Sequence, residues 1–299
     1  MIALGDYATK EQIAEARTRM GLDKPLPEQY VTWLASIARG DLGISFRNRE
    51  AVASAITARL PATLELGLFA LVLAVMFGLP AGVLGAVYRG RLPDYIVTGV
   101  ALIGLAMPVF WIGLMLLMVF SVELNLLPTG GRSSSSAVLR GPTGFLVLDN
   151  LLHLDPHGAW EALRYLALPT LVLAWYPFAT VARITRSGML DVIRQDYIRT
   201  ARSKGLGERR VITRHALKNA LIPVVTVVGL SIGPLMGGAV LTEYVFSWPG
   251  LGRYTVEVVL ARDFPAIQAV ILLSAAVFTS VNVITDVVYA MVDPRIVYR

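Results

Sequence analysis

The stretch GLFALVLAVMFGLPAGVLGAVY, residues 67–88, carries no charged side chain along its whole length. A helix rises about 1.5 Å per residue and the hydrocarbon core of a bilayer is about 30 Å thick, so about 20 apolar residues are enough to cross it. The helix can begin as early as Pro61, because proline is favoured in the first turn. The stretch therefore predicts a membrane-spanning helix over residues 61–88.

Four further apolar stretches follow this one. They are predicted to span the membrane at residues 95–122, 165–185, 219–242 and 264–290. The composition agrees, because 55% of the 299 residues are hydrophobic, only 16% are charged, and the mean hydropathy is +0.62. A soluble fold is not expected, since a chain of this size has too little polar surface to cover five such helices. The expected fold class is an all-α integral membrane protein with its transmembrane domain over residues 61–299.

Charge and cysteine content exclude further classes of protein. Cysteine is absent, which excludes disulfides, cysteine-ligated zinc, iron–sulfur clusters and a thiol nucleophile. The net charge of +6 is concentrated in the turn 89–94 and the connection 183–218, whereas the loops 123–161 and 243–263 are net acidic. Because Lys and Arg in loops stay cytoplasmic, the first two segments are predicted inside and the acidic loops outside. The basic surplus thus reflects membrane topology, and a nucleic-acid partner is not expected.

Residues 1–60 fall outside the membrane in this topology, as an extracytoplasmic segment. Thr9 to Gln12 fits a capping box for a helix that ends near Gly21, and an apolar stripe predicts a second helix ending near Gly40. These amphipathic helices either pack on the outer mouth of the protein or lie at the membrane interface. No apolar segment in residues 1–60 could start export, so a further spanning helix upstream of this sequence is expected.

The inner connection, residues 186–218, is longer than a tether needs to be. It is predicted as a helix from Leu190 to Lys204, a break at Gly205, and a second helix over residues 207–217. Apolar side chains recur within this basic segment: Leu190, Ile193, Tyr197, Leu206, Val211 and Ile212. They indicate either a docking surface for a partner or packing against the inner ends of the spans.

Several motifs of the chain resemble those of one membrane protein family. The run QDYIRTARSKGL, residues 195–206, followed by RHALKN, residues 214–219, resembles the cytoplasmic coupling loop of ABC-type permeases for dipeptides, oligopeptides and nickel. Further signatures occur in family order: GDLG at 40–43, RLPATLEL at 59–66, Pro108 with Phe110 and Trp111, FSWPGLG at 246–252 and DPR at 293–295. The resemblance extends over essentially the whole chain from Ala3. One departure is Arg199-Thr200-Ala201, where the general permease pattern has Glu-Ala-Ala.

This resemblance implies the transmembrane domain of a type I ABC importer (MetI-like), with five of the family's six spanning helices in this sequence. The implied partners are a homologous second permease, two ATPase subunits, an extracytoplasmic substrate-binding protein and the lipid bilayer of a prokaryotic cytoplasmic membrane. The residues implied in coupling to the ATPase are Asp196, Tyr197, Arg199, Thr200, Ala201, Arg202, Lys204, Gly205 and Leu206.

The implied function is that of a transport subunit for dipeptides or oligopeptides, with a nickel chelate or another small solute as the alternative. The chain contains no Gly-x-x-x-x-Gly-Lys-Ser/Thr loop, so ATP and magnesium are expected on partner subunits and no cofactor is expected in this chain. From the residues alone, a secondary carrier or a membrane scaffold stays open. A carrier would be expected to show internal repeats and several intramembrane carboxylates.

The translocation path is predicted from helix breakers and from polar groups at membrane depth. The candidates are Pro108, Trp111, Asn282 and Asp286, with Glu65 as a further intramembrane carboxylate. Asp286 has the alternative of pairing with an inner arginine. Glycines at 229, 233, 237 and 238 are expected to pack against the partner permease. His153 and His157 are four residues apart, but Pro156 lies between them, so no metal site is predicted.

Overall fold

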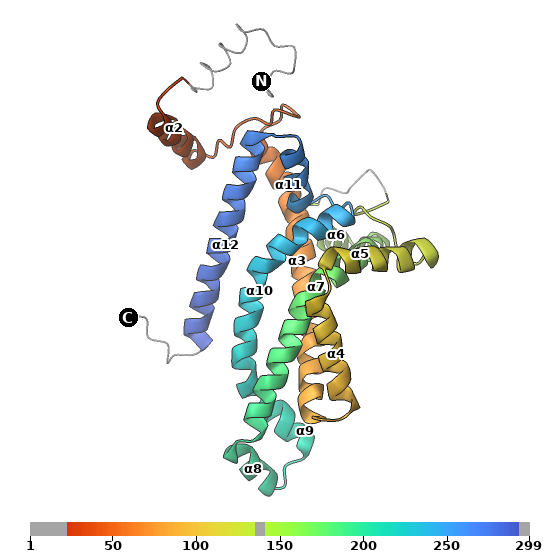
Figure 1. Ribbon diagram of the computed structural model, residues 1–299. Helices are drawn as coiled ribbons and strands as arrows, with labels where there is room; N and C mark the ends of the chain where they lie inside the picture. Colours follow the sequence, from red (N-terminus) through yellow and green to blue (C-terminus); the bar gives the residue numbers. More distant parts are fainter. Residues whose placement is uncertain (1–22, 135–140, 293–299) are drawn as a thin grey trace.

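The computed structural model describes residues 23–134 and 141–292, and this part of the chain contains helices and no strand. The helices are α2 (Leu26–Ala38), α3 (Val52–Val87), α4 (Leu92–Ala106), α5 (Val109–Leu117), η1 (Met118–Glu123), α6 (Leu146–Leu152), α7 (Pro156–Ile193), α8 (Asp196–Ser203), α9 (Glu208–Arg210), η2 (Val211–Ala216), α10 (Leu217–Val245), α11 (Leu251–Leu260) and α12 (Phe264–Val292). The long helices run beside one another, with α8 and α9 at one end and α2 and α11 at the other (Figure 1). We call these the inner and the outer end, following the predicted topology.

Four segments are long and apolar enough to cross a membrane: Val52–Val87, Pro156–Ile193, Glu208–Gly233 and Phe264–Thr285. A fifth crossing is possible if α4 and α5 act as one bent span. Each of these segments overlaps one of the five stretches predicted from the sequence, with bounds that differ at one or both ends. The structure thus has the all-helical, membrane-spanning architecture that the composition indicates.

A stripe of small residues brings α3 and α7 together as the central pair. Ala70, Ala74, Gly78 and Gly82 recur every fourth position on α3, and all four are buried. A Cβ atom at Gly82 would lie 2.5 Å from the Ala182 carbonyl oxygen of α7. The two backbones therefore approach closely, which is the packing that small residues permit between helices in a bilayer.

The stretch expected as one span over residues 95–122 is instead broken. The helices α4 and α5 are bent by 106° at Met107 and Pro108. Met107 is extended, with φ −88° and ψ 137°, because the ring of a following proline disfavours helical backbone. Pro108 therefore ends one helix and begins the next, as expected of the helix breaker predicted at this position, so residues 95–122 do not form one straight helix.

Two glycines of α10, Gly229 and Gly233, face a helix of the same chain, where packing against a partner permease was expected. A Cβ atom at Gly229 would lie 2.6 Å from Thr285 Cγ2, and one at Gly233 would lie 2.6 Å from Phe278 Cε2. Both contacts are with α12, which runs beside α10 in Figure 1. Gly229 and Gly233 are thus used within this chain, and the side-chain surroundings of residues 237 and 238 lie outside the description.

Helix α2 lies where the second helix of residues 1–60 was predicted. It is followed by Gly40, whose φ of +80° ends the helix as predicted. The rings of Tyr30 and Trp33 lie 6.0 Å apart, and no side chain of α2 is buried. The helix predicted between Thr9 and Gly21 lies outside the described residues.

Candidate coupling site and outer contact network

The inner end carries a helical elbow, which we define as residues 194–216. Helix α7 ends at Ile193, and Gln195, with φ −74° and ψ 151°, leads into the short helix α8. The predicted helix from Leu190 to Lys204 is therefore interrupted at residues 194 and 195, so α8 has an orientation of its own (Figure 1). Gly205, with φ +78°, then turns the chain towards α9, as the glycine break predicted.

One face of α8 holds the elbow onto the transmembrane helices. Ile198 is fully buried and Ala201 is 8% exposed, in a cluster with Met189 of α7 and Val211 of η2. Ala86, near the inner end of α3, belongs to the same cluster. The apolar side chains Leu190, Ile193, Leu206 and Ile212 also pack in or against it. These residues thus follow the packing alternative, and they fix α8 to the inner ends of three helices.

The opposite face of α8 is polar and exposed. Its exposed residues are Asp196, Tyr197, Arg199, Thr200, Arg202 and Ser203, and Lys204, directly after the helix, is exposed as well. The Tyr197 hydroxyl accepts a hydrogen bond of 2.6 Å from Asn219 Nδ2, which orients the ring without covering it. The Arg202 guanidinium donates two hydrogen bonds to the Glu208 carboxylate, at 2.7 and 3.1 Å, and this carboxylate raises the pKa of Arg202. The pair closes the turn around Gly205.

The nine residues that the resemblance implied in coupling therefore divide into two groups. Seven are exposed around α8 and the following turn, whereas Ala201 is buried and Leu206 is half-buried against the elbow's own cluster. Sequence reasoning missed Ile198, the main buried side chain of α8. The spacing of Ile198 and Ala201 among polar neighbours was the signal for it, because residues three apart share one face of a helix.

At the outer end, two motifs that are far apart in sequence meet. The indole nitrogen of Trp248, in FSWPGLG, donates a 3.0 Å hydrogen bond to the carbonyl of Ala62, in RLPATLEL. Thr63 donates to the buried carboxylate of Glu243 at 2.6 Å and accepts from the Leu251 amide at 2.8 Å. These bonds connect the outer part of α3 with the turn between α10 and α11.

An ion pair adds a third segment to this outer network. Glu65, whose side chain is 1% exposed, pairs with Arg132 from the loop between η1 and α6. The other Glu65 oxygen accepts a 2.9 Å hydrogen bond from the Val147 amide. The guanidinium also donates to the Gly144 carbonyl at 2.7 Å and lies 5.7 Å from the centre of the Trp248 ring. Both carboxylate oxygens of Glu65 therefore bind groups of the same chain, and no sequence pattern pointed to Arg132 as its partner.

Three of the four candidates for the translocation path lie at two separate places in the described part of the chain. Pro108 and Trp111 lie at the bend between α4 and α5, and Trp111 is 42% exposed. Asn282 is half-buried on α12, which lies on the other side of α10 in Figure 1. The surroundings of the Asp286 side chain are not described, so its predicted role and its alternative pairing stay predictions.

Together these features define a multi-pass helical membrane protein whose inner end presents a fixed, exposed polar helix. The chain belongs to the family of binding-protein-dependent transport system inner membrane components, whose family model matches residues 78–298. A second model, for the N-terminal part of such membrane components, matches residues 1–67. The chain is accordingly a transport subunit of the bacterial inner membrane.

Individual relatives agree with this family. The chain is 47% identical to the di/tripeptide transport system permease protein DppB of Pseudomonas aeruginosa, over 99% of this chain and 88% of the relative. It is 44% identical to the dipeptide transport system permease protein DppB of Escherichia coli K12, over 100% of this chain and 89% of the relative. An inward-facing structure of the MetNI methionine ABC transporter matches with a TM-score of 0.58 at 16% identity, over 78% of this chain and 93% of that one, which supports the fold.

Proposed function

We propose that this chain is one permease subunit of an ATP-driven importer of dipeptides and tripeptides. The substrate class comes from the relatives, which are named as di/tripeptide and dipeptide permeases and match along nearly the whole chain. The observation that carries the ATP-driven mechanism is the elbow, where α8 is fixed on one face by Ile198 and exposed on the other. An exposed helix with charged and polar side chains at the cytoplasmic end is suited to polar, charge-complementary contacts with a partner subunit.

The mechanism that follows is a mechanical one. The exposed face of α8 contacts an ATPase subunit, which holds the ATP and magnesium and closes on a second ATPase. Because Ile198 and Ala201 pack with residues of α3, α7 and η2, a displacement of α8 is passed to the inner ends of those helices. The second permease completes the pathway, and an extracytoplasmic binding protein delivers the peptide to the outer end.

The proposal is tested by uptake in cells that lack other peptide transporters and carry the complete transporter. Labelled L-alanyl-L-alanine is supplied with an excess of an unlabelled tripeptide, free alanine or a nickel–histidine chelate. We expect the tripeptide to compete and the other two to have no effect. We also expect uptake to follow cellular ATP and to survive collapse of the proton gradient.

Two results would overturn the proposal. Accumulation of nickel without peptide uptake would assign the alternative substrate. Loss of uptake on adding a protonophore, with ATP held constant, would indicate an ion-coupled carrier.

A further inference from the structure

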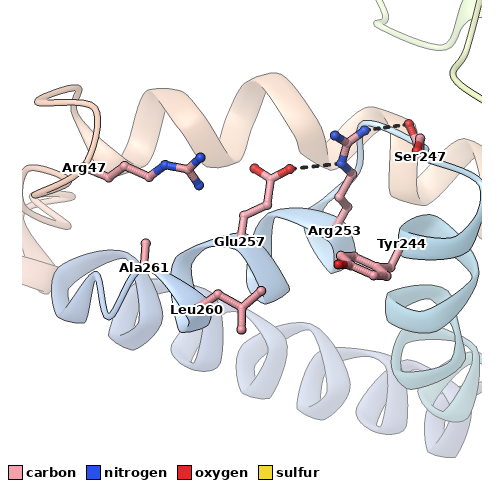
Figure 2. A pocket seen from close by; sticks show the side chains of 7 residues that line it. All are labelled: Arg47, Tyr244, Ser247, Arg253, Glu257, Leu260 and Ala261. Atoms are coloured by element: carbon pink, nitrogen blue, oxygen red, sulfur yellow. Dashed lines mark hydrogen bonds and ion pairs between the residues drawn. The ribbon is translucent and has the colours of Figure 1, made fainter.

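An open pocket of about 660 Å³ lies at the outer end, beside α11. Its lining comes from the loop before α3, from the end of α10 and from α11: Arg47, Tyr244, Ser247, Arg253, Glu257 and Leu260. Figure 2 shows the Glu257 carboxylate between the two arginine side chains, with Tyr244 and Leu260 below them. The volume falls within the range of about 300–1,000 Å³ that is typical of small-molecule sites.

Some of the charged groups in this pocket have a partner within the chain and others do not. Arg253 Nε donates to Glu257 Oε1 at 3.0 Å, and its Nη1 donates to the Ser247 carbonyl at 2.8 Å. The Arg47 guanidinium, in contrast, has no ion-pair or hydrogen-bond partner among residues 23–134 and 141–292. Glu257 Oε2 likewise keeps free acceptor capacity, since the carboxylate's pairing with Arg253 uses the other oxygen. The unpaired Arg47 guanidinium and the free Glu257 Oε2 thus lie in the same pocket.

The backbone around Arg47 is held in place, so its position is built into the fold. The carboxylate of Asp263, which is 1% exposed, accepts hydrogen bonds from the Ser45 hydroxyl and from the Phe46 amide at 3.1 Å. The Arg47 amide lies 3.5 Å from the same carboxylate. These contacts use the backbone of residues 46 and 47 and leave the Arg47 side chain free to meet a ligand.

The pairing of opposite charges with apolar surface defines the ligand. An arginine fork is suited to a carboxylate, and a free carboxylate oxygen is suited to an ammonium group. Leu260 is 73% exposed and Tyr244 is 52% exposed, so both offer apolar surface to a side chain. The two ends of a dipeptide lie about 7 Å apart when it is extended, a length that a pocket of this size accommodates.

We propose that this pocket binds the free peptide zwitterion at the outer end, with its C-terminal carboxylate on Arg47 and its amino group on Glu257. The inference rests on the peptide import proposed above and names where the permease itself first contacts the substrate. A purely acidic partner would gain from Arg47 but would be repelled by Glu257. The presence of both signs therefore favours the zwitterion over an acidic protein surface.

The test uses the complete transporter in lipid nanodiscs, without the binding protein, and measures binding of L-alanyl-L-phenylalanine by ligand-observed NMR. We expect the dissociation constant to rise by about tenfold for Arg47→Ala, and similarly when the ligand is the C-terminal amide. Arg47→Lys should give an intermediate value, because it keeps the charge but not the fork. The matched control is Arg39→Ala, which removes an exposed arginine of the same outer segment outside the pocket.

Three results would overturn the inference: no binding to the unmodified transporter, equal binding by Arg47→Ala, or equal binding of the amide. If the transporter binds no free peptide but retains its purified binding protein only when Arg47 is present, the pocket is a protein-docking surface instead. Uptake of labelled dipeptide, measured on the same variants, separates this inference from the proposed function. If the unmodified transporter takes up the dipeptide but Arg47→Ala does not weaken dipeptide binding, the peptide site in this pocket is refuted and the proposed import function is not.

Discussion

The replacement Arg132→Ala tests the outer network, because it leaves a buried carboxylate without its cation. Glu65 is 1% exposed and would keep only the Val147 amide, while the Gly144 carbonyl would lose the guanidinium. Removing one partner of a buried ion pair costs about 3–5 kcal/mol. Since Arg132 itself is 12% exposed and one hydrogen bond to Glu65 remains, we expect a loss near the lower end, about 3 kcal/mol.

The assay is reversible denaturation of the purified protein in detergent, followed by tryptophan fluorescence, to which Trp248 beside Arg132 contributes. Adding Glu65→Gln to Arg132→Ala removes the unpaired charge and keeps an acceptor for the Val147 amide. The double variant should therefore recover about half of the lost stability. Arg164→Ala is the control, because this exposed arginine makes one hydrogen bond to the Leu126 carbonyl and should cost under about 1 kcal/mol. Equal losses for Arg132→Ala and Arg164→Ala, or no recovery on adding Glu65→Gln, would show that the buried ion pair does not stabilise the outer network.

Three further predictions concern the elbow. Gly205→Asn should retain peptide uptake, because asparagine tolerates a φ of +78° and a Cβ atom would meet nothing within 4 Å. Gly205→Val should lose most of the uptake, because a β-branched residue is strained at this φ. Equal loss in both variants would show that a partner approaches the glycine closely. Ile198→Ala should lower the free energy of unfolding by about 2–4 kcal/mol, as measured by denaturation, and a change below about 1 kcal/mol would contradict its role in fixing α8. The side chains of Arg202 and Glu208 are 40% and 57% exposed, so solvent screens their ion pair. Their coupling energy in a double-mutant cycle should be under about 1 kcal/mol and should fall with added salt. A larger value that does not depend on salt would contradict this screening.

The long helices could be predicted from sequence because length and hydropathy act locally along the chain. Residues 67–88 are apolar enough to require a bilayer, whatever they pack against. The glycine break in the elbow was equally local, since Gly205 has the left-handed backbone that its position suggested. Pro108 was predicted as a helix breaker, but the size of the bend was not, because the hydropathy of residues 95–122 is unaffected by the change of direction.

The outer network could not be predicted because it depends on contacts between distant segments. Glu65 and Arg132 are 67 positions apart, and Thr63 and Glu243 are 180 apart. Each motif could be recognised in the sequence, but no sequence pattern indicated which motifs would be in contact in the folded chain. The close approach of α3 and α7 did have a local signal, the small residues from Ala70 to Gly82 at every fourth position.

The central claim is that the exposed face of α8 docks on an ATPase subunit, and site-directed cross-linking tests it most directly. The chain has no cysteine, so Thr200→Cys provides a single attachment point for a photoreactive maleimide. We expect the exposed position 200 to cross-link to the ATPase with a yield that changes when ATP is added. The neighbouring Ala201→Cys, at a position that is 8% exposed and faces the elbow's own cluster, should not cross-link. Absence of an ATPase adduct at position 200 in the active transporter would show that α8 is not the docking helix.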